Sequence, residues 1–366
     1  MMRTKFSLLA LLCLLSARPT LAAESFSSFG PEQTVTLLDL GVHLMNPEMY
    51  SEQWGITILP EGGGRAGADF IISNIGLGDH KAAVRGEYTD PAGKKYKCLL
   101  EFSSDDWKNQ AGAFALTLGE NRLSGDLEGV RFKITCPELT LDLVMKNVAP
   151  PWQPGSGKLT LEKDGKEEGF YRMVYPSPRS VVTGTISAGG KTVEVKQGVG
   201  LCDHSFTNIG PHKLARRWFR FKHLSPEVSV LLVEVEHPSS AGGSTRGYVL
   251  VYDDGGRVIA SARARFEYDG WIQDTQSEEG YRIPRQVRVV AVDGAATLSG
   301  TLTMTKIEKV SDPLADLDAI RRAVARRFSK PRDYYLACKF SLTAKTAKGE
   351  KIWKGEDVYK FIYVNP

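Results

Sequence analysis

Three features of the sequence predict an all-β protein. Polar and apolar residues alternate with a period of two in many short segments, among them KKYKCLLEF (94–102), GVRFKIT (129–135) and VSVLLVEVEH (228–237). Such segments recur about every ten residues. Turns rich in Asp and Gly, at Asp253–Gly256 and Asp293–Gly294, join neighbouring segments as hairpins. This spacing favours antiparallel barrels or sandwiches over a parallel α/β sheet.

One segment, residues 312–330, departs from this pattern and predicts a single amphipathic helix. Asp312 or the preceding Ser311 is a suitable N-cap, Pro313 occupies the first turn, and the arginines lie late in the segment. Its apolar residues form one stripe: Leu314, Leu317, Ile320, Val324 and Phe328. We expect this helix to pack against the outside of a barrel, or alternatively to bring its arginines to an anionic membrane surface.

The N-terminus has the pattern of a secretory signal peptide at residues 1–23. A basic start at Arg3 and Lys5 is followed by the apolar run Phe6–Leu15 and by small residues. We therefore expect export, most simply to a bacterial periplasm and otherwise by secretion. The remainder exceeds the usual size of a single core, which predicts two domains, at 24–197 and 198–366. The Pro- and Gly-rich stretch 147–157 is an alternative boundary.

Charge and cysteine content limit the classes of function. The formal net charge of +4 falls to +1 without the three basic residues of the leader, which gives no support to nucleic-acid binding. Four cysteines remain, and in an oxidising compartment they allow three connectivities. Cys98 with Cys136 is the simplest pair, whereas Cys202 and Cys338 either pair with each other or stay free.

The stretch 198–221, GVGLCDHSFTNIGPHKLARRWFRF, gathers residue types that enzymes use. In an extended strand Cys202 and His204 point to one face and Asp203 to the other. A Cys–His pair can act as nucleophile and base, although a buried thiol beside an unrelated imidazole is the simpler interpretation.

Histidines in and after this stretch raise the question of a metal site. His204, His212, His223 and His237, together with Asp203, offer enough ligand atoms. The chain contains no H-E-x-x-H or C-x-x-C motif, so we expect neither a metal nor another cofactor.

A ligand pocket is the remaining interpretation of this stretch. In a strand at 217–222, Trp218, Arg220 and Lys222 share one face, and the other face carries Arg217, Phe219 and Phe221. Aromatic residues with a few polar anchors suit a cavity that holds an amphipathic molecule. The alternative is that the aromatics are core and the arginines are solvated or paired.

At this stretch the sequence resembles the tandem-lipocalin superfamily of fungal survival factors, AttH-like proteins and carotenoid hydratases. The resemblance is strongest to the survival factors, whose Pro-His-x-x-Ala-x-Arg-Trp run is matched by Pro211, His212, Ala215, Arg217 and Trp218. The segments 51–76 and 280–289 resemble further parts of that family. Of the hydratase signature Asp-His-Asn-Trp, Asp203 and His204 are kept, whereas Ser205 and Phe206 replace the other half.

The resemblance implies two lipocalin-like β-barrels packed together, with a cavity for a large hydrophobic ligand at or near their junction. Our first hypothesis is a carrier of a sphingolipid, ceramide-like lipid or isoprenoid. The ligand-binding candidates are Phe206, His212, Arg217, Trp218, Phe219, Phe221, Tyr252 and Asp254. Our second hypothesis is a hydratase, isomerase or cyclase acting on a terpenoid or polyene, with Asp203 or His204 as general acid. A third is a structural domain with a vestigial pocket.

Overall fold

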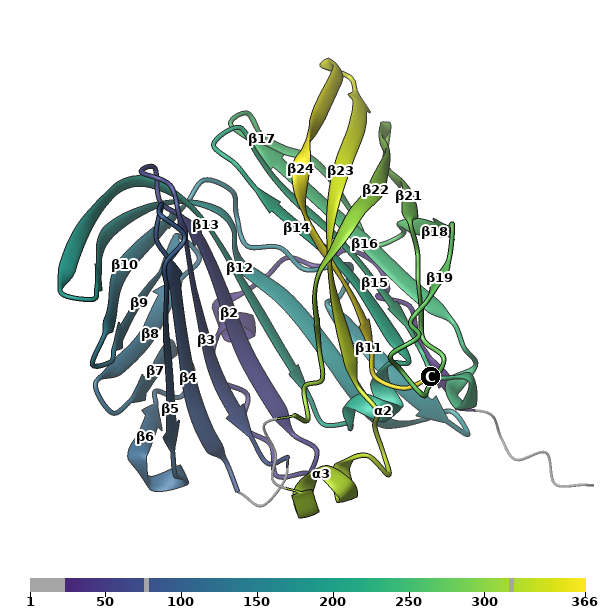
Figure 1. The fold of residues 1–366 in the computed structure, drawn as a ribbon, viewed down its shortest axis with the longest axis horizontal. Coiled ribbons are helices and arrows are strands. Elements are labelled where there is room, and N and C mark those ends of the chain that lie inside the picture. The colour runs from purple at the N-terminus through teal and green to yellow at the C-terminus, as the bar shows by residue number, and fades with distance from the viewer. Residues whose placement is uncertain (1–23, 76–78, 316–318) are drawn as a thin grey trace, which may run out of the picture.

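The structure, a computed structural model, describes residues 24–75, 79–315 and 319–366. The signal peptide predicted at residues 1–23 lies outside the described residues. Two curled antiparallel sheets, each a lipocalin-like barrel, make up most of the described chain, which confirms the predicted all-β class (Figure 1). No helix in the described part of the chain is long and apolar enough to cross a membrane.

The first sheet follows the path β5-β4-β3-β2-β13-β12-β10-β9-β8-β7-β6, and β11 and β1 extend it beside β12. Its strands are β1 (Ser25–Phe26), β2 (Ser51–Leu59), β3 (Arg65–Ser73), β4 (Lys81–Thr89), β5 (Lys95–Phe102), β6 (Trp107–Asn109), β7 (Phe114–Leu118), β8 (Asn121–Asp126), β9 (Gly129–Thr135), β10 (Leu139–Asn147), β11 (Lys158–Lys163), β12 (Lys166–Ala188) and β13 (Lys191–Thr207).

The second sheet follows the path β17-β16-β15-β14-β24-β23-β22-β21-β18, and a separate small sheet pairs β19 with β20. These strands are β14 (Arg217–Leu224), β15 (Val228–Glu236), β16 (Thr245–Asp253), β17 (Gly256–Ser261), β18 (Arg265–Asp269), β19 (Ile272–Gln273), β20 (Arg282–Ile283), β21 (Gln286–Asp293), β22 (Ala296–Ser311), β23 (Arg332–Thr346) and β24 (Gly349–Tyr363). The predicted hairpin turns at Asp253–Gly256 and Asp293–Gly294 are confirmed, because they join β16 to β17 and β21 to β22.

Helical structure is sparse and short. In the described part of the chain it consists of α1 (Leu37–Leu40), α2 (Pro211–Leu214), α3 (Ala319–Ala325) and two single 3₁₀ turns, at Ser104–Asp106 and Ser239–Ala241. The helix predicted over 312–330 is therefore shorter than expected within the described residues, since residues 313–315 form a turn. The Asp312 carboxylate accepts a hydrogen bond from the Leu314 backbone N–H, as an N-cap side chain would, but it caps this turn.

Three apolar clusters organise the core. One fills each barrel, and the third lies between them, where β12 and β13 face β14, β15 and β16 (Figure 1). The continuous apolar runs in β15 and β16 follow from this arrangement, because both faces of these strands are covered. In β16, Val249 and Val251 point into the second barrel, whereas Tyr248, Leu250 and Tyr252 point into the junction.

The boundary predicted after residue 197 falls inside β13. Residues of β13 up to Thr207 pair with β2 and β12 of the first sheet, and the second sheet begins only at Arg217. The sequence places the break too early because β13 is unusually long, and its last residues both complete the first barrel and face the second.

The four cysteines of residues 24–366 divide as the simplest pairing predicts. Cys98 and Cys136 form a disulfide within the first barrel. Cys202 and Cys338 are free and buried, in different barrels. Burial raises the pKa of both free thiols, to about 12 at Cys338, so neither thiol is a ready nucleophile.

Candidate functional site

The candidate site is centred on the end of β13, where successive side chains point to opposite sides. Cys202, His204 and Phe206 point into the first barrel, and Asp203 points to the junction, as the period of a strand predicts. The two hydratase-like candidates, Asp203 and His204, therefore lie on opposite faces of one strand, and their side chains do not point into the same space.

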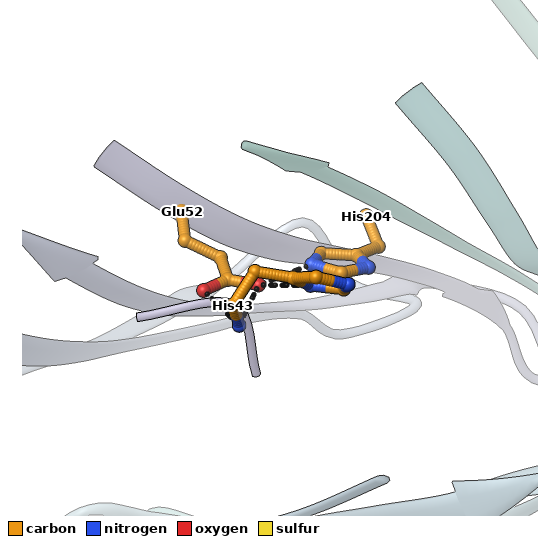
Figure 2. Close-up of side chains that lie close together, drawn as sticks. All are labelled: His43, Glu52 and His204. Atoms are coloured by element: carbon orange, nitrogen blue, oxygen red, sulfur yellow. Dashed lines mark hydrogen bonds and ion pairs between the residues drawn. The ribbon is translucent and has the colours of Figure 1, made fainter. Parts of the chain in front are cut away.

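Inside the first barrel, His204 belongs to a buried polar cluster with Glu52 and His43 (Figure 2). His204 Nε2 lies 2.7 Å from Glu52 Oε1, and His43 Nδ1 lies 3.2 Å from the same oxygen. The Tyr50 hydroxyl donates to Glu52 Oε2 at 2.5 Å. Rings close the cluster from above and below, since His204 stacks on Trp54 and His43 stacks on Phe206.

Hydrogen bonding decides the charge of this cluster. Burial alone would raise the pKa of Glu52, but hydrogen bonds from His204 and His43 outweigh burial and lower that pKa to about 2. Burial also lowers the pKa of the His204 imidazole. His204 Nε2 faces the ionised Glu52 carboxylate, and its Nδ1 lies 3.2 Å from the Asp39 carbonyl oxygen, so both ring nitrogens face acceptor oxygens. The cluster thus fastens the segment that carries His43 to the first barrel.

Sequence reasoning missed Glu52 and His43. The alternation in SEQWGITIL could have identified Glu52, because Glu52 lies on the same face of this strand as Trp54, Ile56 and Ile58, which are all buried. A carboxylate at a core position demands partners. His43 lies outside any strand and gave no comparable signal.

The same three residues are the group of potential metal ligands that the described part of the chain brings together. His43, Glu52 and His204 each offer a ligand atom, all within 4.8 Å of one another. The other predicted ligands lie apart from them. His223 Nδ1 is 2.7 Å from Asp357, and His237 Nδ1 is 2.7 Å from the Leu214 carbonyl oxygen.

On the junction side, polar contacts join the two barrels. Lys222 of β14 donates to Asp203 at 2.7 Å, and Gly55 stands opposite Asp203 on β2, where a Cβ would lie 2.9 Å from Asp203 Oδ1. The Tyr175 and Tyr248 hydroxyls are 2.8 Å apart within the apolar layer. These contacts fix the two barrels against each other.

A cavity of about 620 Å³ opens beside this layer. Its wall is formed by residues 32–35 and 148–152 and by Tyr252, Gly256 and Arg257. Arg257 is held by Glu32 at 3.0 Å, so the cavity combines an apolar wall with one ion pair.

The predicted ligand-binding residues are dispersed. Trp218 and Tyr252 belong to the junction layer, and Tyr252 also lines the cavity. Phe219 and Phe221 lie in the core of the second barrel, because odd-numbered residues of β14 point away from the junction. Asp254 is exposed and pairs with Arg179 at 3.0 Å.

The other three candidates also have local partners. Arg217 binds Glu236 of β15 through two nitrogens, at 2.8 and 2.5 Å, and stacks on Tyr268 and Phe361 inside the second barrel. Phe206 covers His43 in the first barrel. His212 lies on α2 near Phe328.

The sequence is similar to one protein family and to curated members of it. The sequence profile of the Svf1 family matches residues 93–351. The Ceramide-binding protein SVF1 of Candida albicans is 25% identical over 186 residues, which cover 48% of this chain and 47% of that protein. The chain thus spans about half the length of the curated relatives it matches.

Solved structures share the tandem architecture. An AttH candidate from Nitrosomonas europaea superposes with a TM-score of 0.58 at 15% identity, covering 93% of this chain and 100% of that one. Kievitone hydratase from Nectria haematococca gives a TM-score of 0.54 at 10% identity, covering 92% and 98%. At these identities the likeness concerns the fold.

Proposed function

The chain belongs to the Svf1 family, and on this premise we propose that it binds and carries a large hydrophobic ligand, a ceramide-like lipid or an isoprenoid, at the junction of its two barrels. The observation that carries the proposal is the cavity of about 620 Å³ beside the apolar layer between the barrels. Its volume lies within the roughly 300–1,000 Å³ of small-molecule sites.

The chemistry of the wall suits an amphiphile. Val35, Val148 and Trp152 offer apolar surface, and the Arg257–Glu32 pair lies beside them. Each methylene that leaves water contributes about 0.8 kcal/mol, so an acyl or isoprenoid chain supplies ample affinity without catalysis. Because Asp203 and His204 lie on opposite faces of β13, the alternative function, a hydratase, isomerase or cyclase, would have one of them and not both as its general acid.

The first experiment is native purification followed by mass spectrometry of co-extracted lipids, together with lipid transfer between two liposome populations. We expect a defined hydrophobic molecule and faster transfer than without protein. Protein that is free of lipid and does not accelerate transfer would overturn the proposal.

A pair of matched variants tests the location. Val148 lines the cavity and is 44% exposed, so Val148→Trp adds bulk at the opening without disturbing the core. Val144 on β10 is 39% exposed and does not line the cavity, which makes Val144→Trp the control. We expect bound lipid to fall only in the first variant. Equal lipid in both would place the ligand elsewhere.

We also propose that the region of α3 touches membrane surfaces during ligand exchange. Val324 and Phe328 are 54% and 60% exposed, beside the exposed Arg327. Such a mixture suits the headgroup boundary of an anionic bilayer. Val324→Ser with Phe328→Ser should reduce co-sedimentation with anionic vesicles, whereas Val290→Ser with Val292→Ser, equally exposed on β21, should not. Unchanged co-sedimentation of the α3 variant would contradict this role.

Export is a further part of the proposal. The basic start and apolar run of residues 1–23 support cleavage near Glu24 and residence in a bacterial periplasm. The intact mass of the protein from a periplasmic fraction should correspond to a chain that begins near Glu24. Full-length protein confined to the cytoplasmic fraction would contradict export.

A further inference from the structure

Two cations face each other on the side of the second sheet that is turned toward the first barrel. Arg220 on β14 pairs in register with Lys360 on β24, and both side chains are exposed. Like charges directly opposite one another on neighbouring strands destabilise a sheet. The arrangement therefore has an electrostatic cost.

Neither cation has a carboxylate partner within ion-pair distance among the described residues. Arg220 lies over the Trp218 ring at 4.7 Å, and Lys360 lies over the Tyr335 ring at 4.8 Å. The nearby carboxylate of Asp203 is taken by Lys222 at 2.7 Å. Both positive charges are held in place by aromatic faces, which leave their N–H donors available.

Two other lysines of the same hairpin have carboxylate partners across the strands. On this face of β23 and β24, Lys339 is opposite Glu356 and Lys345 is opposite Glu350, with nitrogen–oxygen distances of 3.6 and 3.4 Å. Lys354, on the same face, lies opposite Ser341 and has no carboxylate partner among the described residues. Lys360 differs from all of these lysines, because one of its neighbours in register is a second cation, Arg220.

Protein surrounds this pair although water reaches it. Partial desolvation, followed by the charges of Arg220 and Lys222, lowers the pKa of the Lys360 ammonium, and Asp333 and Asp69 only partly offset them. Asp69 belongs to β3 of the first sheet, so both barrels flank the pair. In addition, Asp333 Oδ1 is buried without a hydrogen-bond partner.

We propose that Arg220 and Lys360 form an anion-binding site for a phosphate group, carried by a lipid headgroup or free in solution. An oxyanion between the two strands would accept hydrogen bonds from the guanidinium and the ammonium and would cancel their repulsion. This site shares no residue with the cavity beside Tyr252, so it goes beyond the proposed hydrophobic ligand site and stands independently of it.

The test uses isothermal titration of the full chain with three probes: inorganic phosphate, hexanoyl ceramide 1-phosphate and the neutral hexanoyl ceramide. Sodium chloride at equal ionic strength controls for screening. We expect Arg220→Gln/Lys360→Gln to weaken binding of the phosphorylated probes by about tenfold or more, as expected for the loss of charge-assisted hydrogen bonds. Lys339→Gln, on the same hairpin but at an ordinary ion pair, should bind like the wild type.

The probes also distinguish the source of the phosphate. Tighter binding of ceramide 1-phosphate than of inorganic phosphate would identify a lipid headgroup as the ligand of this site. Equal affinity for the two probes would identify a free phosphate anion. Wild-type protein that binds neither phosphate probe, or a double variant with unchanged affinity for them, would overturn the site. Loss of neutral ceramide binding alone would count against the carrier function and leave this site standing.

A second readout separates ligand binding from a structural role. Removing one of two facing cations relieves repulsion, so Lys360→Gln without phosphate should melt at or above the wild-type temperature. Added phosphate should raise the melting temperature of the wild type and not of the double variant. A variant that melts lower without phosphate, or a phosphate shift that sodium chloride reproduces, would contradict the proposal.

Discussion

The hydroxyl pair of Tyr175 and Tyr248 gives a quantitative test of how the barrels are joined. Tyr175 comes from β12 and Tyr248 from β16, so their 2.8 Å contact crosses the junction. Both residues are 2% exposed, and within the described chain each hydroxyl has the other as its hydrogen-bond partner. Truncating one of them leaves the other hydroxyl buried and unsatisfied.

The expected energies follow from that geometry. Tyr175→Phe and Tyr248→Phe should each lower the free energy of unfolding by about 1–3 kcal/mol, because a buried polar group loses its partner. The double variant removes both polar groups and should cost about 1 kcal/mol or less. The coupling between the two sites, which is the sum of the two single losses minus the loss of the double variant, should therefore be about 1–6 kcal/mol.

Urea unfolding of the four proteins of this double-mutant cycle measures the coupling, provided that the denaturant slopes agree. Tyr252→Phe is the control, since its residue lies on the same strand but lines the cavity instead of pairing across the junction. It should change stability little. Additive losses from the two single substitutions would refute the reasoning, as would a double variant that is less stable than either single variant.

Two buried ionisable groups and the disulfide provide further tests. Burial raises the pKa of Glu234 from 4.5 to about 7; stability should fall as pH rises between these values, by roughly 3 kcal/mol at most, and Glu234→Gln should flatten that slope in urea melts. A wild-type slope in the variant would contradict this. Burial lowers the pKa of His237 from 6.5 to about 4. The free energy of unfolding should therefore fall as pH drops through this range, and an equal fall in the His237→Asn variant would show that another group causes it. Reducing Cys98–Cys136, which are 38 residues apart, should lower the free energy of unfolding by about 4 kcal/mol. An unchanged midpoint in reducing agent would refute that contribution.

Local pattern was sufficient for much of the fold. The strands at GVRFKIT and VSVLLVEVEH, the hairpin turns, and the opposite orientations of Asp203 and His204 follow from the two-residue period of a strand, which depends on neighbouring residues alone. The alternation on β14 was likewise predictable, and it separates Trp218 from Phe219 and Phe221. What the alternation did not say is which face meets the other barrel.

Tertiary structure decided the sites, because they join residues that are far apart in the chain. Glu52 and His204 are 152 residues apart, yet β2 and β13 are neighbours in the sheet. The facing cations Arg220 and Lys360 depend in the same way on the pairing of β14 with β24. Sequence alone determined an all-β chain with polar and aromatic residues in fixed alternation. Long-range strand pairing decided which of those residues became core, which joined the barrels and which remain available to a ligand.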